Sequence, residues 1–102
     1  DITWLKAPDE PSPVSSTSSD SWKVIAALAG DMAKAPVAPG LVTAGTDSRY
    51  LEPVAKDVYR FQPMKFALKD TQMIHGTNEH MTLENLDLAV QFYARLIATA
   101  AG

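Results

Sequence analysis

Apolar residues recur at helical spacing in two stretches of the chain. The first predicted helix starts at residue 21, with Ser19 or Asp20 available as its N-cap, and ends before Pro36. Val24 and Leu28 make a second side of this helix apolar as well, so we expect it to have neighbours on both sides. Its main stripe consists of Trp22, Ile25, Ala26, Ala29 and Met32.

The second predicted helix covers residues 82–100 and carries the clearest helical pattern. Thr82 is its expected N-cap, and Glu84 places a negative charge in the first turn, where the helix dipole favours it. We expect its apolar face to consist of Leu86, Ala89, Val90, Tyr93, Leu96 and Ile97.

Short β-prone runs alternate with these helices. Residues 41–43 read as a buried strand, residues 58–61 as a second strand stopped by Pro63, and residues 2–5 as a third. Ser48 is expected to cap one or two helical turns through Glu52. The serine- and proline-rich stretch at 8–21 reads as a linker or extended loop. Alternating strands and helices predict an α/β fold with parallel pairing.

Composition excludes several classes of partner. The chain has 102 residues, of which 46% are hydrophobic, and this length allows one domain or part of one. Net charge is −3 and Lys/Arg residues do not cluster, so no nucleic acid and no anionic membrane surface is expected as partner. No apolar run is long enough to predict a membrane segment. The missing cysteines exclude disulfides but assign no localisation. Because the chain opens with Asp1, we expect the natural start upstream.

Two polar, glycine-bearing loops lie between apolar segments, at residues 45–50 and 73–82. An open α/β sheet binds ligands at the carboxyl ends of its strands, which is where the first loop is expected. The second loop carries His75 and directly precedes the last helix. We therefore expect both loops to face one cleft.

His75 is the residue best suited to bind a metal. A neutral imidazole is a good zinc ligand, but zinc takes about three or four protein ligands. The chain contains no cysteine and one other histidine, His80, five residues further on. A complete zinc site within this chain is therefore not expected. Taken without further context, His75 is more often a loop histidine bound to backbone, and His80 a solvent-facing residue before the helix cap.

Three motifs occur in a fixed order along the chain. They are Gly45-Thr46-Asp47-Ser48-Arg49-Tyr50, Tyr59-Arg60-Phe61-Gln62-Pro63 and Ile74-His75-Gly76-Thr77-Asn78-Glu79. In this order and spacing, the chain resembles the C-terminal part of the catalytic domain in the aminoacylase-1 and carboxypeptidase S family of zinc-dependent amidohydrolases and exopeptidases, peptidase family M20. Residues 4–16 and the closing stretch 92–97 also resemble that family, and the second motif places the chain nearer carboxypeptidase S.

The resemblance implies a fold and partners. The fold is a fragment of a three-layer α/β/α zinc-exopeptidase catalytic domain of the phosphorylase/hydrolase-like kind, with a parallel-rich sheet and flanking helices. Residues 1–13 would be the tail of a lid or dimerisation domain and its crossover, and residues 14–102 the C-terminal segment of the catalytic domain. The implied partners are the rest of that catalytic domain and its lid domain, and the family also allows a homodimer.

The resemblance also implies an activity, namely hydrolysis of the amide bond in an N-acyl amino acid or short peptide. His75 would be a ligand to one of two zinc ions, and the backbone of Gly45 and Thr46 would approach the substrate carboxylate. The other zinc ligands and the general base have no counterpart here, so no catalytic residue is expected and the fragment alone should be inactive.

Several neighbouring residues have two interpretations. Asp47 and Arg49 form a charge pair that either braces the pocket or lies solvated at the surface. Asn78 and Glu79 either accept the second nitrogen of His75 or fix the loop before the Thr82 cap, and the fixing role is favoured.

Arg60 is expected on the face opposite the core, because it alternates with Tyr59 and Phe61, which are interpreted as core residues. The family's paired glycines appear here as Ala44-Gly45, and the histidine loop carries Gly76-Thr77, so substrate preference is open.

Two rival functions remain. The alternative to an enzyme segment is a non-catalytic α/β interaction module. The third is an autonomous metal-binding domain that uses His75, Glu79 and His80, although the adjacent Glu79 and His80 would both have to turn toward one metal ion.

Overall fold

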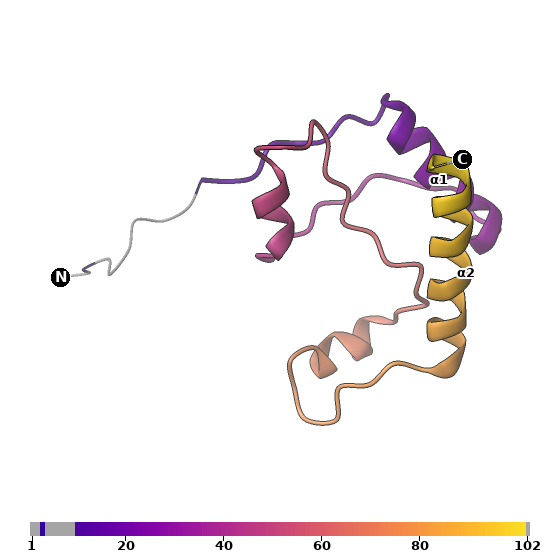
Figure 1. The fold of residues 1–102 in the computed structure, drawn as a ribbon. Helices are drawn as coiled ribbons and strands as arrows, with labels where there is room; N and C mark the ends of the chain where they lie inside the picture. Colours follow the sequence, from indigo (N-terminus) through magenta and orange to yellow (C-terminus); the bar gives the residue numbers. More distant parts are fainter. Residues whose placement is uncertain (1–2, 4–9, 102) are drawn as a thin grey trace.

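The computed structural model describes residue 3 and residues 10–101, and within them the chain forms two α-helices and two 3₁₀-helices (Figure 1). The strand expected at residues 2–5 and the start of the serine- and proline-rich stretch fall almost wholly outside the described residues. In chain order, the elements are α1 (Asp20–Ala33), η1 (Asp47–Leu51), η2 (Leu68–Met73) and α2 (Leu83–Ala100).

Both predicted α-helices are confirmed, together with their caps. The hydroxyl of Ser19 accepts the backbone amide of Trp22 at 3.1 Å and starts α1. Lys34, whose φ of 51° is left-handed, ends it. The hydroxyl of Thr82 accepts the amide of Asn85 at 3.1 Å and starts α2. Each hydroxyl satisfies one of the amides that a helix leaves unpaired in its first turn.

The core lies where α1 and α2 pack side by side (Figure 1). Phe92 of α2 is 1% exposed, and Ala29 of α1 is also buried. The ring of Phe92 contacts Phe61 at a centroid distance of 4.9 Å and the edge of Tyr93 at 5.4 Å. Aromatic packing of this kind adds to the burial of apolar area, so Phe92 is the centre of this small core.

An ion pair joins the two helices at their surface. The guanidinium of Arg95 lies 2.7 Å from the carboxylate of Asp31, which also binds Lys34 at 2.9 Å. The hydrogen bonds from Lys34 and Arg95 lower the pKa of Asp31 from 3.8 to about 2.

Within the first turn of α1, a hydrogen bond from Lys23 likewise lowers the pKa of Asp20.

The apolar face predicted for α2 is only partly covered. Leu86, Val90 and Ile97 are each more than half exposed, whereas the buried residues of α2 are Asn85 and Phe92. Helix α2 has apolar residues on two sides, but α1 is its only helical neighbour within the described residues. One side is therefore packed and the other is open.

The prediction of an α/β fold with a parallel-rich sheet is wrong for this structure. No strand occurs within residues 10–101, and η2, which the sequence pattern did not predict, forms at Leu68–Met73. Residues 41–43 and 58–61, both predicted as strands, lie outside any ladder of backbone hydrogen bonds. A strand needs a neighbouring strand, and neither segment has one within the described chain.

The backbone of the segment 58–65 is instead paired with side chains. The hydroxyl of Ser15 accepts the amide of Val58 at 2.8 Å and donates to its carbonyl at 2.9 Å. The side-chain amide of Asn85 binds the backbone of Lys65 in the same two-way manner, at 2.9 and 3.2 Å. Tyr93 donates to the carbonyl of Phe61 at 3.1 Å. These bonds satisfy five backbone groups of the segment, namely the amides and carbonyls of Val58 and Lys65 and the carbonyl of Phe61, which a sheet would otherwise pair.

The helices within the described residues are each too short or too polar to cross a membrane.

Candidate functional site

The first candidate loop ends in the short helix η1. Thr46 is the N-cap of η1, because its hydroxyl accepts the amide of Ser48 at 3.3 Å. The predicted helical turn is thus present, but it is capped by Thr46 rather than by Ser48 and ends at Leu51. The hydroxyls of Thr46 and Ser48 also form a hydrogen bond with each other.

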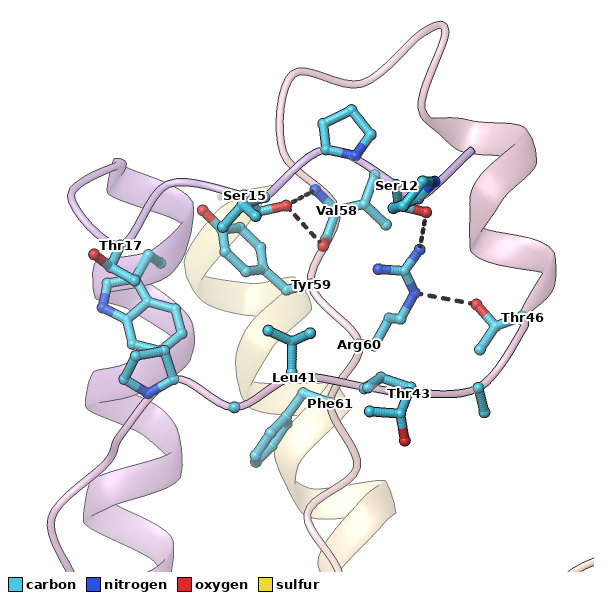
Figure 2. Close-up of a pocket in the computed structure, with 18 of the residues that line it drawn as sticks. Ser12, Ser15, Thr17, Leu41, Thr43, Thr46, Val58, Tyr59, Arg60 and Phe61 are labelled. Atoms are coloured by element: carbon cyan, nitrogen blue, oxygen red, sulfur yellow. Dashed lines mark hydrogen bonds between the residues drawn. The ribbon is translucent and has the colours of Figure 1, made fainter. Parts of the chain in front are cut away.

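A groove of about 890 Å³ lies beside this loop (Figure 2). Its walls come from residues 10–15 and Thr17, from α1, from residues 37–46 and from residues 58–61, and they also include Arg49. Of the six predicted site residues, the groove contains Gly45, Thr46 and Arg49. A Cβ added at Gly45 would meet no atom within 4 Å, so the space beside this glycine is open to a ligand.

Arg60 connects the walls of the groove. Its side chain is 25% exposed and points away from Tyr59 and Phe61, toward Ser12 and Thr46 (Figure 2). Alternation along residues 58–61 predicted this direction but no role for the residue. What distinguishes Arg60 is its set of polar partners, and only the folded chain brings these residues together.

The two aromatic residues beside Arg60 anchor the segment to the rest of the molecule. The hydroxyl of Tyr59 donates to the carbonyl of Ser16 at 2.6 Å and also lies 2.6 Å from the hydroxyl of Ser19. Its ring is 5.9 Å from that of Trp22. Phe61 packs on Phe92. Tyr59 and Phe61 are half-buried, so they pack at the edge of the core.

The second candidate loop holds His75 in an unusual backbone conformation. His75 has a φ of 58°, in the left-handed region that non-glycine residues rarely adopt. Its backbone amide donates to the carboxylate of Glu79 at 3.1 Å. The amide of Gly76 donates to Met73 at 2.9 Å, and a Cβ at Gly76 would come within 3.1 Å of the Gln72 carbonyl. A side chain at position 76 would therefore crowd the backbone of this turn, and glycine avoids that contact.

The imidazole of His75 is exposed, and no described residue forms a hydrogen bond with it. Glu79 fixes the loop by accepting the backbone amide, which corresponds to the loop-fixing interpretation of this residue. His80 behaves differently, because its Nδ1 lies 2.6 Å from the carbonyl of Asn78 and must carry the hydrogen.

The structure does not bring the two loops into one cleft. His75 and Glu79 lie outside the lining of the groove, and so does Asp47, the first residue of η1. Residues 10–101 contain no group of three or more His, Asp or Glu side chains that could hold a metal ion. The described residues therefore do not by themselves form a group that could hold a metal ion. The autonomous metal-binding domain finds no support.

Comparison with known proteins identifies relatives of the chain. The family model described as "Peptidase family M20/M25/M40" matches residues 1–99. The N-fatty-acyl-amino acid synthase/hydrolase PM20D1 of Xenopus tropicalis is 44% identical over 62 residues, which cover 61% of this chain and 12% of that protein. "Probable carboxypeptidase S-like 2" of Dictyostelium discoideum is 36% identical over 89 residues, 86% of this chain and 17% of that protein. The mouse PM20D1 enzyme is 33% identical over 64 residues, 63% of this chain and 13% of that protein.

The chain thus spans about one-sixth or less of the length of these curated relatives. No solved structure matches it. The resemblance carried by the three motifs is confirmed, and since the family model covers nearly every residue, the chain belongs to peptidase family M20/M25/M40.

Proposed function

We propose that this chain is a segment of a di-zinc metallopeptidase that hydrolyses the amide bond of N-acyl amino acids or short peptides. His75 supplies one zinc ligand, and Gly45 and Thr46 form part of the substrate pocket. Residues 1–13 are the tail of a lid domain and its crossover, and residues 14–102 belong to the catalytic domain. The remaining zinc ligands and the general base come from outside this chain, so the chain alone is inactive.

The observation that carries the proposal is the conformation of His75, within a chain of this family. A left-handed backbone at a non-glycine residue costs on the order of 1 kcal/mol and persists where the surroundings enforce it, often at functional sites. Here Glu79 and the tight turn at Gly76 enforce it. The turn presents the imidazole at the surface of the described chain, where a metal ion held by residues of other segments can reach it.

The metal would supply the chemistry that these residues lack. A bound zinc ion lowers the pKa of its water to about 7 and polarises the scissile carbonyl. The chain's own contributions are to hold one imidazole in place through the His75–Glu79 bond and to shape one wall of the pocket.

The groove supports the proposal that Gly45 and Thr46 form part of the substrate pocket. The substrates named for the relatives, N-fatty-acyl amino acids and the peptides of a carboxypeptidase, share an amide bond close to a free carboxylate. Open backbone at Gly45 allows such a group to approach closely. In the proposal, Arg49 in the groove wall and Asp47 at the start of η1 brace this loop.

The open face of α2 supports a larger parent domain. Leu86, Val90 and Ile97 are exposed on one helix, and apolar patches of this kind usually mark a surface that another part of a protein covers. In the proposal, the rest of the catalytic domain covers it. A homodimer of the parent is compatible with this arrangement.

The test is the substitution His75→Asn in the full-length protein that carries this segment. Asparagine tolerates a left-handed backbone, so it removes the imidazole without the added strain that alanine would bring. We expect the loss of about one zinc equivalent and a fall in hydrolysis of N-acyl amino acids of more than about 100-fold, since even residues behind the ligands matter 10- to 100-fold. Zinc is measured by atomic absorption and hydrolysis by release of the free amino acid.

The matched control is His80→Asn, which changes a nearby histidine whose ring binds the Asn78 carbonyl. It should retain both zinc and activity. Unchanged zinc content and unchanged hydrolysis in His75→Asn would contradict the proposal. If the unsubstituted protein neither binds zinc nor hydrolyses these substrates, the non-catalytic interaction module becomes the better explanation of this chain.

A further inference from the structure

Arg60 contacts two segments of the chain, one at Ser12 and one at residues 46–52. Its Nε donates to the hydroxyls of Ser48 at 2.6 Å and Thr46 at 3.2 Å. Its Nη2 donates to the hydroxyl of Ser12 at 3.2 Å and to the carboxylate of Glu52 at 3.2 Å. Figure 2 shows the guanidinium between the segment that contains Ser12 and the loop that contains Thr46.

The chemistry of arginine suits this connection. A guanidinium is planar and carries five N–H groups in a fixed fork, so it can bind several acceptors from different directions at once. The ion pair with Glu52 is largely withdrawn from solvent, because the two side chains are 25% and 23% exposed. Partial burial reduces the screening of this ion pair by salt, and a hydrogen bond between two charged groups is stronger than one between neutral groups.

The loop at residues 44–48 depends on this support. Helix η1 has five residues, and 3₁₀-helices of that length are not stable by themselves. Among residues 10–101, the hydrogen bonds that tie Thr46, Ser48 and Glu52 to residues outside 46–52 all come from Arg60. Thr46 is the N-cap of η1 and follows Gly45 directly, so the position of Gly45 in the groove wall depends on the same contacts.

We propose that Arg60 is a positioning residue that holds the Gly45–Thr46 loop in the groove wall and thereby sets the affinity for substrate. This inference rests on the proposed function, in which that loop contacts the substrate. Arg60 itself does not touch the reacting atoms. Its loss therefore weakens substrate binding and leaves the chemical step largely intact.

The experiment uses Arg60→Lys in the full-length protein, with Arg95→Lys as the matched control. Lysine keeps the positive charge but replaces the fork with a single ammonium, which cannot join Ser48, Thr46, Ser12 and Glu52 together. Arg95 also binds a carboxylate, that of Asp31, but lies outside the groove lining. We expect KM to rise by about tenfold in Arg60→Lys, the effect of losing one charge-assisted hydrogen bond, with kcat within about twofold. Arg95→Lys should change neither.

A second readout is independent of any substrate. Hydrogen exchange of peptides that cover residues 44–52 should become faster in Arg60→Lys and stay unchanged in Arg95→Lys, while peptides from α2 should behave alike in both. If the unsubstituted protein hydrolyses no N-acyl amino acid, the proposed function fails, whereas exchange still decides whether Arg60 holds the loop.

Ser48→Ala provides a second test in case Arg60→Lys does not fold. It removes the acceptor of the shortest Arg60 bond and leaves the charge pair with Glu52 intact. A smaller rise in KM, with faster exchange over residues 44–52, would support the proposal. Unchanged KM and unchanged exchange in Arg60→Lys would overturn it, and the same result in Ser48→Ala would overturn it where Arg60→Lys does not fold.

Discussion

The α1–α2 pair and the His75 loop are stabilised in different ways. The helix pair is held by apolar burial, with Phe92 1% exposed against Phe61 and with Ala29 on the facing helix. The loop from residue 74 to residue 82 contains no buried residue. It is held by local hydrogen bonds, such as the one between the His75 amide and the Glu79 carboxylate.

The difference predicts how each region responds to substitution. Buried apolar area contributes most of the stability of a fold, whereas a few exposed hydrogen bonds contribute little net free energy. Substitutions in the helix pair should therefore alter the free energy of unfolding, and substitutions in the loop should alter chemistry. The Gly45–Thr46 loop is intermediate between these two regions, because Arg60 links it to Ser12 through hydrogen bonds of which those to Ser48 and Glu52 are partly buried.

The largest expected effect is that of Phe92→Ala. The substitution removes the most buried large side chain among the described residues and its contacts with two aromatic rings, so we expect a loss of about 3–5 kcal/mol in the free energy of unfolding. Urea unfolding followed by circular dichroism measures it.

Phe66→Ala is the matched control for this prediction. It makes the same change at a side chain that is 47% exposed, and it should cost clearly less. Equal losses in the two variants would show that the helix pair is not the centre of the core.

Local signals account for the parts of the fold that could be predicted. Helices α1 and α2 follow from apolar periodicity and from the caps Ser19 and Thr82, all of which lie within a few residues of one another. The predicted strands failed because strand pairing depends on distant neighbours. At and just after the second predicted strand, the side chains of Ser15 and Asn85 bind the backbone of Val58 and Lys65 instead. The helix η2 was missed although Asp70 accepts the Ala67 amide at 2.9 Å, a short-range bond that propensity alone does not reveal.

For the candidate site, the motifs could be read from the sequence, but the backbone strain and the long-range contacts could not. The motif order identified the family and pointed to His75, Gly45 and Thr46. The strain at His75 could not be read from residue types, although the glycine that follows it indicates a tight turn. The role of Arg60 was out of reach, because its partners Ser12 and Glu52 meet it only through the fold.

A smaller effect on stability is expected at His75 itself. His75→Gly should stabilise the protein by up to about 1 kcal/mol relative to His75→Ala, because glycine adopts a φ of 58° without the steric cost of a Cβ. Both variants lack the imidazole, so both should lose zinc and activity alike under the proposed function. The free energy of unfolding without added zinc measures the strain.

The same pair of substitutions at Thr77 serves as the control, since Thr77 is not among the residues with positive φ. There, glycine should be no better than alanine. If glycine and alanine were equivalent at position 75 as well, the left-handed backbone would not be a source of strain, and the loop would resemble an ordinary surface turn.

The smallest expected effect concerns the ion pair on the outside of the helix pair. Asp31 has its pKa lowered from 3.8 to about 2 by hydrogen bonds from Lys34 and Arg95. A carboxyl with a lowered folded-state pKa stabilises the protein above its unfolded value, and this contribution is lost as the pH falls from about 3.8 toward 2. Asp31→Asn should therefore flatten the dependence of unfolding free energy on pH within that window.

The contribution should be small and sensitive to salt, because the side chain of Asp31 is 49% exposed and surface ion pairs are weak. Asp87→Asn is the control, since the carboxylate of Asp87 binds the neutral side chain of Gln91 at 2.6 Å. Unfolding at a series of pH values, in low and in high salt, separates the two variants. If Asp31→Asn weakened the helix pair as much as Phe92→Ala does, charge rather than apolar burial would hold α1 against α2, and the contrast with the His75 loop would disappear.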